Sequence, residues 1–450
     1  MELMFYLSSR IYTVNKKKLF LLFLLMVSVS AQAVKNLVLM NNNRSNYANI
    51  LSLPDTCEKL SVVIDKTKFF SGEKIIGEYL NETKGIKNMI GFPDACVING
   101  TIYVFYRFGV PHSAVKGLVN NKVYYAYLDE HGLWHTQLYL EFPLEDDYDT
   151  KGYYRDFRGV STVEHHGDGY DAIAIGCYTP TTETTTKVYY QTFFCKLVQK
   201  ADKTLTYINY ELLPQVSPYD LRISAPAEDG NLTRIGSVPA GKSIINGDYL
   251  YYIIYIGHNV QVLRWRIDAD DKHLIPTCND VRQICYISNE DRKYQFSEVG
   301  AVFVDEKRLL MSVREENSHK NYNYVCDIST FDENVPNSAH VTLPIITTYG
   351  AFGPSMIIAD NNILLFGRRN DLIAKSDNMV YLTKEGICIK EGISFVEHDM
   401  VVKDSMYCSE VVYNNELYVF YYYRQDTGGL FKYTLAYKTI SIDHLKYCLQ

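Results

Sequence analysis

Five residues with chemically useful side chains stand seven or eight positions from a predicted tight turn: Arg107, Glu298, Arg314, Arg369 and Tyr407. Residues equally far before and after such a turn lie beside each other on adjacent antiparallel strands. Glu298 and Arg314, eight positions on either side of Glu306, should therefore be neighbours. If the hairpins repeat, their equivalent positions gather at one rim. Arginine guanidinium groups bind carboxylates through two parallel hydrogen bonds, so the pattern predicts a carboxylate ligand.

The elements that must position these residues are β-hairpins. Apolar runs rich in β-branched and aromatic residues recur with polar turns between them, and amphipathic helical periodicity is nearly absent. Turn residues that accept positive φ favour short hairpins. The predicted turns are Asn99-Gly100, His166-Gly167-Asp168-Gly169, Asn246-Gly247, Asp305-Glu306-Lys307, Asn361-Asn362 and Asn414-Asn415.

Six such hairpins, each with room for two more strands, predict an all-β fold, a six-bladed β-propeller. A pair of packed β-sheets, a sandwich, is the alternative. Residues 58–65 have the composition of a strand, and we expect them to supply the outer strand that the last blade lacks and so to close the ring.

Length and composition exclude several classes of protein. The chain has 450 residues, 14% aromatic and 22% charged, with 39 tyrosines. An apolar, aromatic-rich chain of this kind can bury a large core, so global disorder is excluded. The net charge of −7 argues against a nucleic-acid partner, because nucleic-acid binders usually carry a basic excess.

The N-terminal segment has the features of a secretory signal. Lys16-Lys17-Lys18 precedes the apolar run Leu19 to Val29, and Ala31-Gln32-Ala33 resembles a cleavage site. We therefore predict a signal peptide over 1–33, a lead-in over 34–57 and one propeller over 58–450. The protein is expected to be secreted, periplasmic or on the cell surface, and an uncleaved anchor is the alternative. No later stretch is apolar enough to span a membrane.

The cysteines give no sign of a metal or cofactor site. All ten lie beyond residue 33, and no two have C-x-x-C spacing. Disulfides are permitted in an exported chain, and Cys57 and Cys448, near the two ends, are one possible pair. We expect no metal and no cofactor. The segment GSVPAGKS, which ends in Gly241-Lys242-Ser243, superficially matches a phosphate-binding loop but lacks the strand-to-helix context of one.

In the order and spacing of its motifs, the chain resembles the sialidase superfamily over roughly residues 85–435. Glu298 and Arg314 are sixteen residues apart, which matches the spacing of about fifteen residues between the glutamate and a triad arginine in the family's fourth blade. Arg369, with Arg368 as its rival, follows the fifth hairpin, and Tyr407 precedes the sixth within Met406-Tyr407-Cys408-Ser409. Asp129, Gly132 and Trp134 resemble a degenerate Asp box, which is a structural turn.

The chain departs from the sialidase pattern at two places, and at both it resembles the catalytic propellers of bacteriophage endosialidases more specifically. The first triad arginine is replaced near Gly91 and Phe92, and His112 occupies the region of the acid/base aspartate. The resemblance implies a glycosidase that cleaves α-linked sialic acid, with endo action on polysialic acid. It implies Tyr407 as nucleophile, Glu298 as its general base and His112 near the leaving group. Arg314, Arg369, Arg368 and Arg107 would then bind the substrate.

Three alternatives remain open at this point. If Tyr407 is structural, Glu298 could act directly on water. A furanosidase-type five-bladed propeller would use Asp94 as base and Glu298 as acid. A non-catalytic sialoglycan-binding propeller, a lectin or adhesin, would keep the arginines without turnover, because a fold does not by itself confer activity.

Overall fold

The computed structural model describes most of the region beyond residue 70. The described residues are 71–80, 89–109, 122–140, 154–181, 191–212, 238–239, 241–256, 259–267, 281–287, 295–317, 320–347, 351–360, 362–369, 377–383, 393–396, 407–426 and 430–449. All of them belong to one compact unit, residues 60–450. Residues 58–65, His112 and Cys57 lie outside the described residues.

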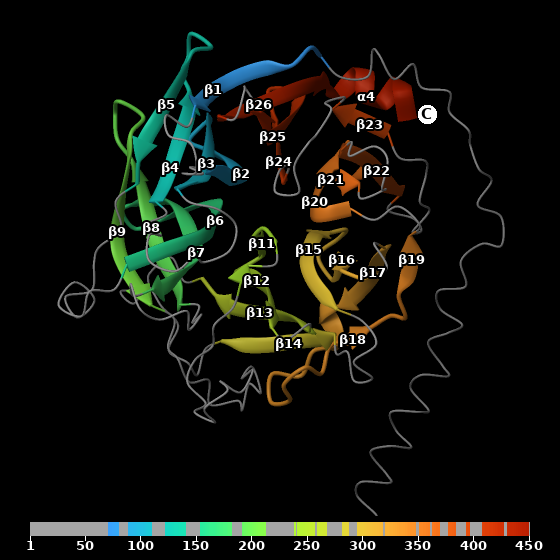
Figure 1. The fold of residues 1–450 in the computed structure, drawn as a ribbon. Coiled ribbons are helices and arrows are strands. Elements are labelled where there is room, and N and C mark those ends of the chain that lie inside the picture. The colour runs from blue at the N-terminus through green and yellow to red at the C-terminus, as the bar shows by residue number, and fades with distance from the viewer. Residues whose placement is uncertain are drawn as a thin grey trace, which may run out of the picture. The chain divides into compact units, whose positions relative to one another are not determined.

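The described strands form six antiparallel sheets, which follow one another along the chain (Figure 1). The first sheet contains β2 (Met89–Ile98), β3 (Thr101–Gly109), β4 (Lys122–Leu128) and β5 (Trp134–Tyr139). The second contains β6 (Tyr154–Gly167), β7 (Tyr170–Thr181), β8 (Gln191–Gln199) and β9 (Leu205–Leu212). The third contains β10 (Val238–Pro239), β11 (Ile244–Asn246), β12 (Tyr249–Ile256), β13 (Asn259–Arg266) and β14 (Arg282–Ile287).

The remaining sheets repeat this plan. The fourth contains β15 (Phe296–Phe303), β16 (Arg308–Glu315), β17 (Lys320–Asp327), β18 (His340–Val341) and β19 (Ile345–Thr347), with the short helix η2 (Ile328–Thr330). The fifth contains β20 (Ala351–Ala359), β21 (Asn362–Arg369), β22 (Asp377–Thr383) and β23 (Ile393–Val396). The sixth contains β24 (Cys408–Tyr413), β25 (Glu416–Asp426) and β26 (Phe431–Ser441), followed by helix α4 (Ile442–Leu449).

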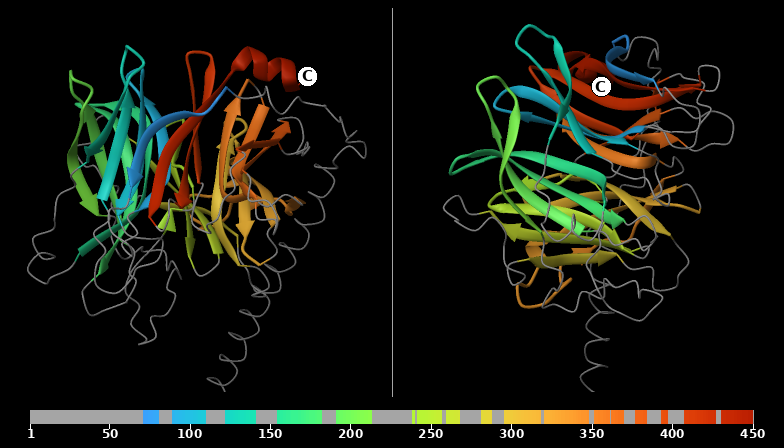
Figure 2. Two further views of the ribbon diagram at one scale, coloured as in Figure 1. Left: turned by 45° about the horizontal axis from the view of Figure 1, so that its top comes forward. Right: turned by 60° about the vertical axis from the view of Figure 1, so that its left-hand side comes forward.

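The N-terminal strand β1 (Lys74–Leu80) completes the sixth sheet by pairing antiparallel with β26. The two strands run alongside each other in both views of Figure 2. A strand from the start of the chain therefore becomes the outer strand of the last sheet, as the sequence predicted. The segment differs, however: the pairing strand is Lys74–Leu80, whereas we expected residues 58–65.

The sheets form a ring because each one buries both faces. In β3, Ile102, Val104 and Tyr106 pack toward the sixth sheet, whereas Tyr103 and Phe105 pack toward the second. Successive side chains of a strand point to opposite faces, so a continuous apolar run needs a cover on each side. Six core clusters fill the six junctions between consecutive sheets, including the one between the sixth and the first.

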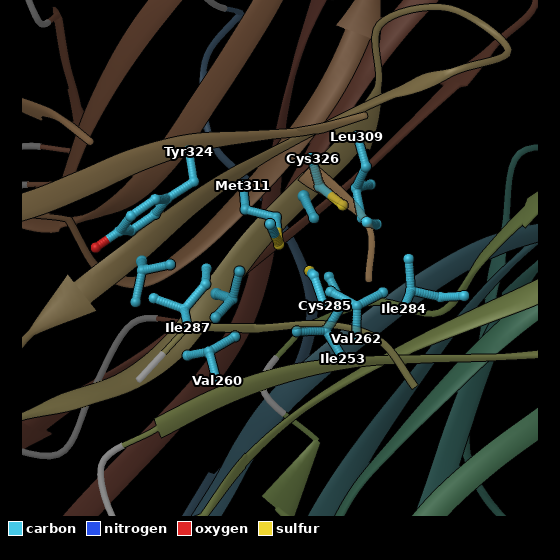
Figure 3. Packing of buried hydrophobic residues seen from close by; sticks show 14 of the residues in the cluster. Ile253, Val260, Val262, Ile284, Cys285, Ile287, Leu309, Met311, Tyr324 and Cys326 are labelled. Atoms are coloured by element: carbon cyan, nitrogen blue, oxygen red, sulfur yellow. The ribbon is translucent and has the colours of Figure 1, made fainter. Parts of the chain in front are cut away.

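Figure 3 shows one of these clusters, between the third and fourth sheets, in which Ile253 and Val262 face Leu309 and Met311. The predicted all-β propeller is confirmed, and a β-sandwich pair is excluded. In the part of the chain that the structure describes, no helix is long and apolar enough to cross a bilayer.

Polar groups join the innermost strands of neighbouring sheets. The Thr162 N–H on β6 donates to Asp94 Oδ2 on β2 at 2.6 Å. The Ala95 N–H on β2 donates to Ser409 Oγ on β24 at 2.7 Å. These bonds cross between strands that no sheet ladder connects, so they fix the sheets relative to one another.

A second set of polar contacts surrounds Lys242. The Ser355 hydroxyl on β20 donates to Glu410 Oε2 on β24 at 2.6 Å, and the Lys242 ammonium interacts electrostatically with both Glu410 and Asp94. Burial raises the pKa of the Asp94 carboxyl to about 7, although Lys242 and the Thr162 N–H act to lower it. Burial also raises the pKa of Glu410, against the opposing effect of Lys242.

These shifts predict that the protein is more stable at mildly acidic pH than at pH 8. Folding raises the pKa of Asp94 from 3.8 to about 7, so between these values the unfolded chain releases the proton more readily than the folded protein does. The free energy of unfolding therefore falls as the pH rises through this window. Glu410 acts in the same direction. The ionisation of Asp94 alone should lower the free energy of unfolding by about 2–3 kcal/mol between pH 5 and pH 8.

Urea unfolding at several pH values measures how the free energy of unfolding depends on pH, and Asp94→Asn should flatten this dependence. An unchanged slope in that variant would refute the assignment.

Candidate active site

The candidate site is built around the carboxylate of Glu298, which accepts hydrogen bonds from three neighbouring sheets. Arg314 Nη1 donates to Oε2 at 2.6 Å, and the Gly353 N–H donates to the same oxygen at 2.8 Å. The Tyr407 hydroxyl donates to Oε1 at 2.5 Å. Glu298 and Arg314 belong to the fourth sheet, Gly353 to the fifth, and Tyr407 immediately precedes β24 of the sixth. The side chains of Glu298 and Arg314 are each 16% exposed, so solvent reaches both groups.

Irregularities at matching places in three innermost strands position these groups. The ladder register shifts between Gly91 and Asp94 in β2, between Phe296 and Val299 in β15, and between Phe352 and Ser355 in β20. A β-bulge leaves a residue out of the ladder and re-aims its side chain. In β15 the shift encloses Glu298, whose carboxylate contacts the fifth sheet and the residue that precedes β24 of the sixth.

Gly353 is required by both backbone conformation and space. Its φ is +58°, in the left-handed region that favours glycine. A Cβ at this position would lie 2.1 Å from Cδ1 of the Tyr407 ring. The missing side chain therefore lets Tyr407 approach closely enough to reach Glu298.

The electrostatics keep Glu298 ionised and Tyr407 protonated. Burial acts to raise the pKa of Glu298, but the Arg314 charge and the hydrogen bonds from Tyr407 and Gly353 outweigh it, and the pKa is lowered. Burial and the negative charge of Glu298 raise the pKa of the Tyr407 phenol well above its usual range. The neutral phenol thus keeps its proton and donates it in a hydrogen bond to an ionised carboxylate. This is the arrangement of a nucleophile beside a general base.

An aromatic residue occupies the other side of Tyr407. The rings of Phe92 and Tyr407 lie 4.4 Å apart between centroids, and Arg107 Cζ lies 4.8 Å from the Phe92 ring centroid. Arg107 is only 2% exposed. Phe92 has a φ of +53°, which is strained for a residue with a bulky side chain. Strain of this kind persists where surrounding contacts hold the residue in place.

The other arginines lie at the level that the hairpin spacing predicted. Arg369 and Arg368 of β21 pair with Ala351 and Phe352 of β20, next to Gly353. Arg107 pairs with Gly91 beside the irregularity of β2. The structure describes the backbone of Arg368 and Arg369 but not their side chains, and His112 lies outside the described residues.

The structure thus brings together Glu298, Arg314 and Tyr407, three residues that the sequence singled out. The sequence reasoning missed the Gly353 N–H and the ring contact of Phe92. A signal for both was present, because Phe92-Pro93 and Phe352-Gly353-Pro354 recur at corresponding places in two innermost strands. Asp94, the base of the furanosidase alternative, is 5% exposed and accepts from Thr162.

The Asp-box-like turn has a structural role. Asp129 accepts the N–H groups of His131 at 2.9 Å and Leu133 at 2.8 Å. Trp134 packs edge-on against Phe420, with ring centroids 5.8 Å apart. The turn therefore connects the first and sixth sheets. Within the described ranges, no group of three or more His, Cys, Asp or Glu side chains is arranged to hold a metal ion.

The fold is similar to those of solved sialidases. A Trypanosoma rangeli sialidase in complex with 2,3-difluorosialic acid, a covalent intermediate, aligns with a TM-score of 0.53 at 11% identity, over 84% of this chain and 60% of that chain. The parainfluenza virus 5 hemagglutinin-neuraminidase ectodomain aligns with a TM-score of 0.50 at 9% identity, over 93% and 99%. The chain therefore spans 60% of the length of the trypanosomal enzyme, less than two thirds.

No known protein-family model matches the sequence, and no curated protein matches it significantly. At these identities the structural likeness shows the fold alone, that of a sialidase-type propeller.

Gly353→Ala is expected to disrupt the site in a protein that still folds. The added methyl group would clash with Tyr407 and force it away from Glu298. An L-residue at this positive φ also strains the backbone, at a cost of about 1–2 kcal/mol. Urea unfolding should show that loss, and any activity that depends on the hydrogen bond between Tyr407 and Glu298 should fall at least about 100-fold. Gly132→Ala is the matched control, because its φ is also positive, at +75°, but a Cβ there meets nothing within 4 Å. Equal activity of the two variants would contradict the role assigned to Gly353.

Proposed function

We propose that this protein is a secreted, sialidase-like glycoside hydrolase that cleaves α-linked sialic acid, acting internally on polysialic acid. We further propose that the six sheets are the six blades of a catalytic propeller and that residues 1–33 direct export. The observation that carries the proposal is the shared Glu298 carboxylate, which holds the Tyr407 hydroxyl and the Arg314 guanidinium.

The chemistry of the substrate favours this pair. Sialic acid carries a carboxylate next to its anomeric carbon, which would repel an anionic nucleophile. A tyrosine is neutral, and sialidases that use one are a known exception to the two-carboxylate rule for glycosidases. The Tyr407 oxygen would bond to the anomeric carbon as the glycosidic bond breaks. Glu298 would accept the phenol proton, and the departing sugar oxygen would take a proton from His112 or from solvent. Water would then attack the anomeric carbon and break its bond to Tyr407, which would recover its proton from Glu298 while the proton of the water passes to His112 or to solvent.

The arginines and His112 have supporting roles in this proposal. Arg314 and Arg369 would bind the sugar carboxylate, with Arg368 and Arg107 adding positive charge nearby. His112 would assist the departing oxygen or bind a neighbouring sugar. Internal cleavage is proposed because Phe92 stands near the place of one triad arginine, which weakens the grip on a single terminal sugar.

Product analysis of the purified protein tests the proposal. The protein is incubated with polysialic acid and, separately, with a monosialyl reporter. Short oligomers from the polymer alone are the expected result, and free sialic acid from both would indicate exo action instead. Saturable binding without product would identify a sialoglycan-binding propeller.

Two substitutions test the chemical roles. Tyr407→Phe and Glu298→Gln should each lower kcat by at least about 100-fold, because each removes a partner of the proton transfer. Tyr413→Phe is the matched control: this tyrosine donates to the Gly100 carbonyl at a distant turn, so kcat should be unchanged. Full activity of both site variants would exclude the proposed nucleophile and base.

A further inference from the structure

The segment that resembles a phosphate-binding loop occupies the innermost position of the third sheet. Strand β10 ends at Pro239, β11 begins at Ile244, and no helix follows. A Cβ on Gly241 would lie 2.0 Å from the Val299 carbonyl oxygen of β15, so the segment runs directly against the fourth sheet. On its other side, the Ser243 N–H donates to Ser161 Oγ of β6 at 2.6 Å. The glycine and serine of the motif thus serve packing against protein, not phosphate.

Lys242 extends from this segment to two sheets that do not adjoin the third. Its ammonium donates to the Glu410 carbonyl on β24 at 2.8 Å and to the Ala95 carbonyl on β2 at 3.2 Å. These acceptors are 168 and 147 residues away along the chain. One side chain therefore ties the third sheet to the first and the sixth.

Both carbonyls belong to strands that carry or directly follow a site residue. Glu410 follows Tyr407 by three positions, and Ala95 follows Phe92 by three. The Ala95 N–H is itself bound by Ser409, so the same stretch of β2 is held to β24 twice. The distance between these strands sets the contact between the Phe92 and Tyr407 rings.

The fifth sheet joins the same network. Ser355 donates to the Glu410 carboxylate at 2.6 Å and follows Gly353 by two positions. Gly353 supplies the N–H that binds Glu298. Lys242 thus binds β24, next to the tyrosine, and β2, which carries its ring partner, and Glu410 links both to the strand of the glycine.

We infer that Lys242 is a positioning residue, which holds β2 and β24 directly, and β20 through Glu410, so that Tyr407 keeps its contacts with Phe92 and Glu298. The inference rests on the proposed function for its kinetic consequences, but its structural content is independent of the reaction.

Charge supports this role. Among the residues that the structure describes, the carboxyl groups that interact with Lys242 are Asp94 on β2 and Glu410 on β24, and the Cys96 thiol also interacts with Asp94 and Lys242. Removing the ammonium would leave two buried carboxylates without a counter-charge, which is costly in a poorly solvated environment. Because burial raises the pKa of Asp94 to about 7, the charge of the cluster changes near neutral pH.

The test uses a reporter at the site that does not require activity. A 4-fluorophenylalanine at position 92 gives one fluorine resonance, whose shift depends on the adjacent Tyr407 ring. Lys242→Met should shift or split that resonance, and Lys242→Arg should restore it in part. Lys307→Met, at an exposed turn, is the matched control and should leave it unchanged.

Kinetics on polysialic acid give the second readout, made on the protein without the fluorine label. Lys242→Met should lower kcat at least 10-fold with less than a threefold change in KM, and should move the pH dependence of kcat. A stable Lys242→Met protein with an unchanged resonance would overturn the inference. A changed resonance in a protein whose wild type makes no product would support the inference and refute the proposed function instead.

A second variant covers the case in which Lys242→Met does not fold. Ser355→Ala removes the hydrogen bond to Glu410 without removing a charge. It should alter the same fluorine resonance, because β20 and β24 are then less firmly held. A resonance identical to that of the wild type would overturn the inference.

Discussion

Each sheet of this protein is apolar on both faces, and this constraint determines the rest of the architecture. A sheet with two apolar faces must be covered twice, and here each sheet is covered by the one before it and the one after it. Such a series leaves two uncovered faces unless it closes. It closes when the sixth sheet packs on the first, and β1 then completes the sixth sheet by pairing with β26.

Closure brings the innermost strands together. These strands carry backbone N–H groups that have no further strand of their own sheet as a hydrogen-bond partner. Serine and carboxylate side chains on these strands accept the missing hydrogen bonds from backbone N–H groups. The cost is a pair of buried carboxylates, Asp94 and Glu410, with Lys242 as the cation between them. The interactions that hold the ring together therefore also determine the positions of the strands that carry the candidate site.

The candidate site depends on departures from regular strand geometry. A register shift in β15 encloses Glu298, and a residue with a side chain at position 353 would exclude Tyr407. Glycine at a positive φ removes that obstacle. The outcome is a neutral phenol bound to an ionised carboxylate beside an arginine, the arrangement on which the proposed reaction depends.

The sequence by itself determined the strands, the turns and the contacts within one hairpin. Paired turn residues and alternating apolar positions place Glu298 opposite Arg314, only sixteen residues away, and the structure shows that ion pair. Local patterns suffice there because the turn dictates the register. Only the tertiary structure decided the contacts between sheets. The Gly353 N–H and the Tyr407 hydroxyl reach Glu298 from 55 and 109 residues away, and Lys242 reaches Glu410 from 168. Such contacts depend on how sheets pack around a closed ring, and no local sequence pattern encodes that packing.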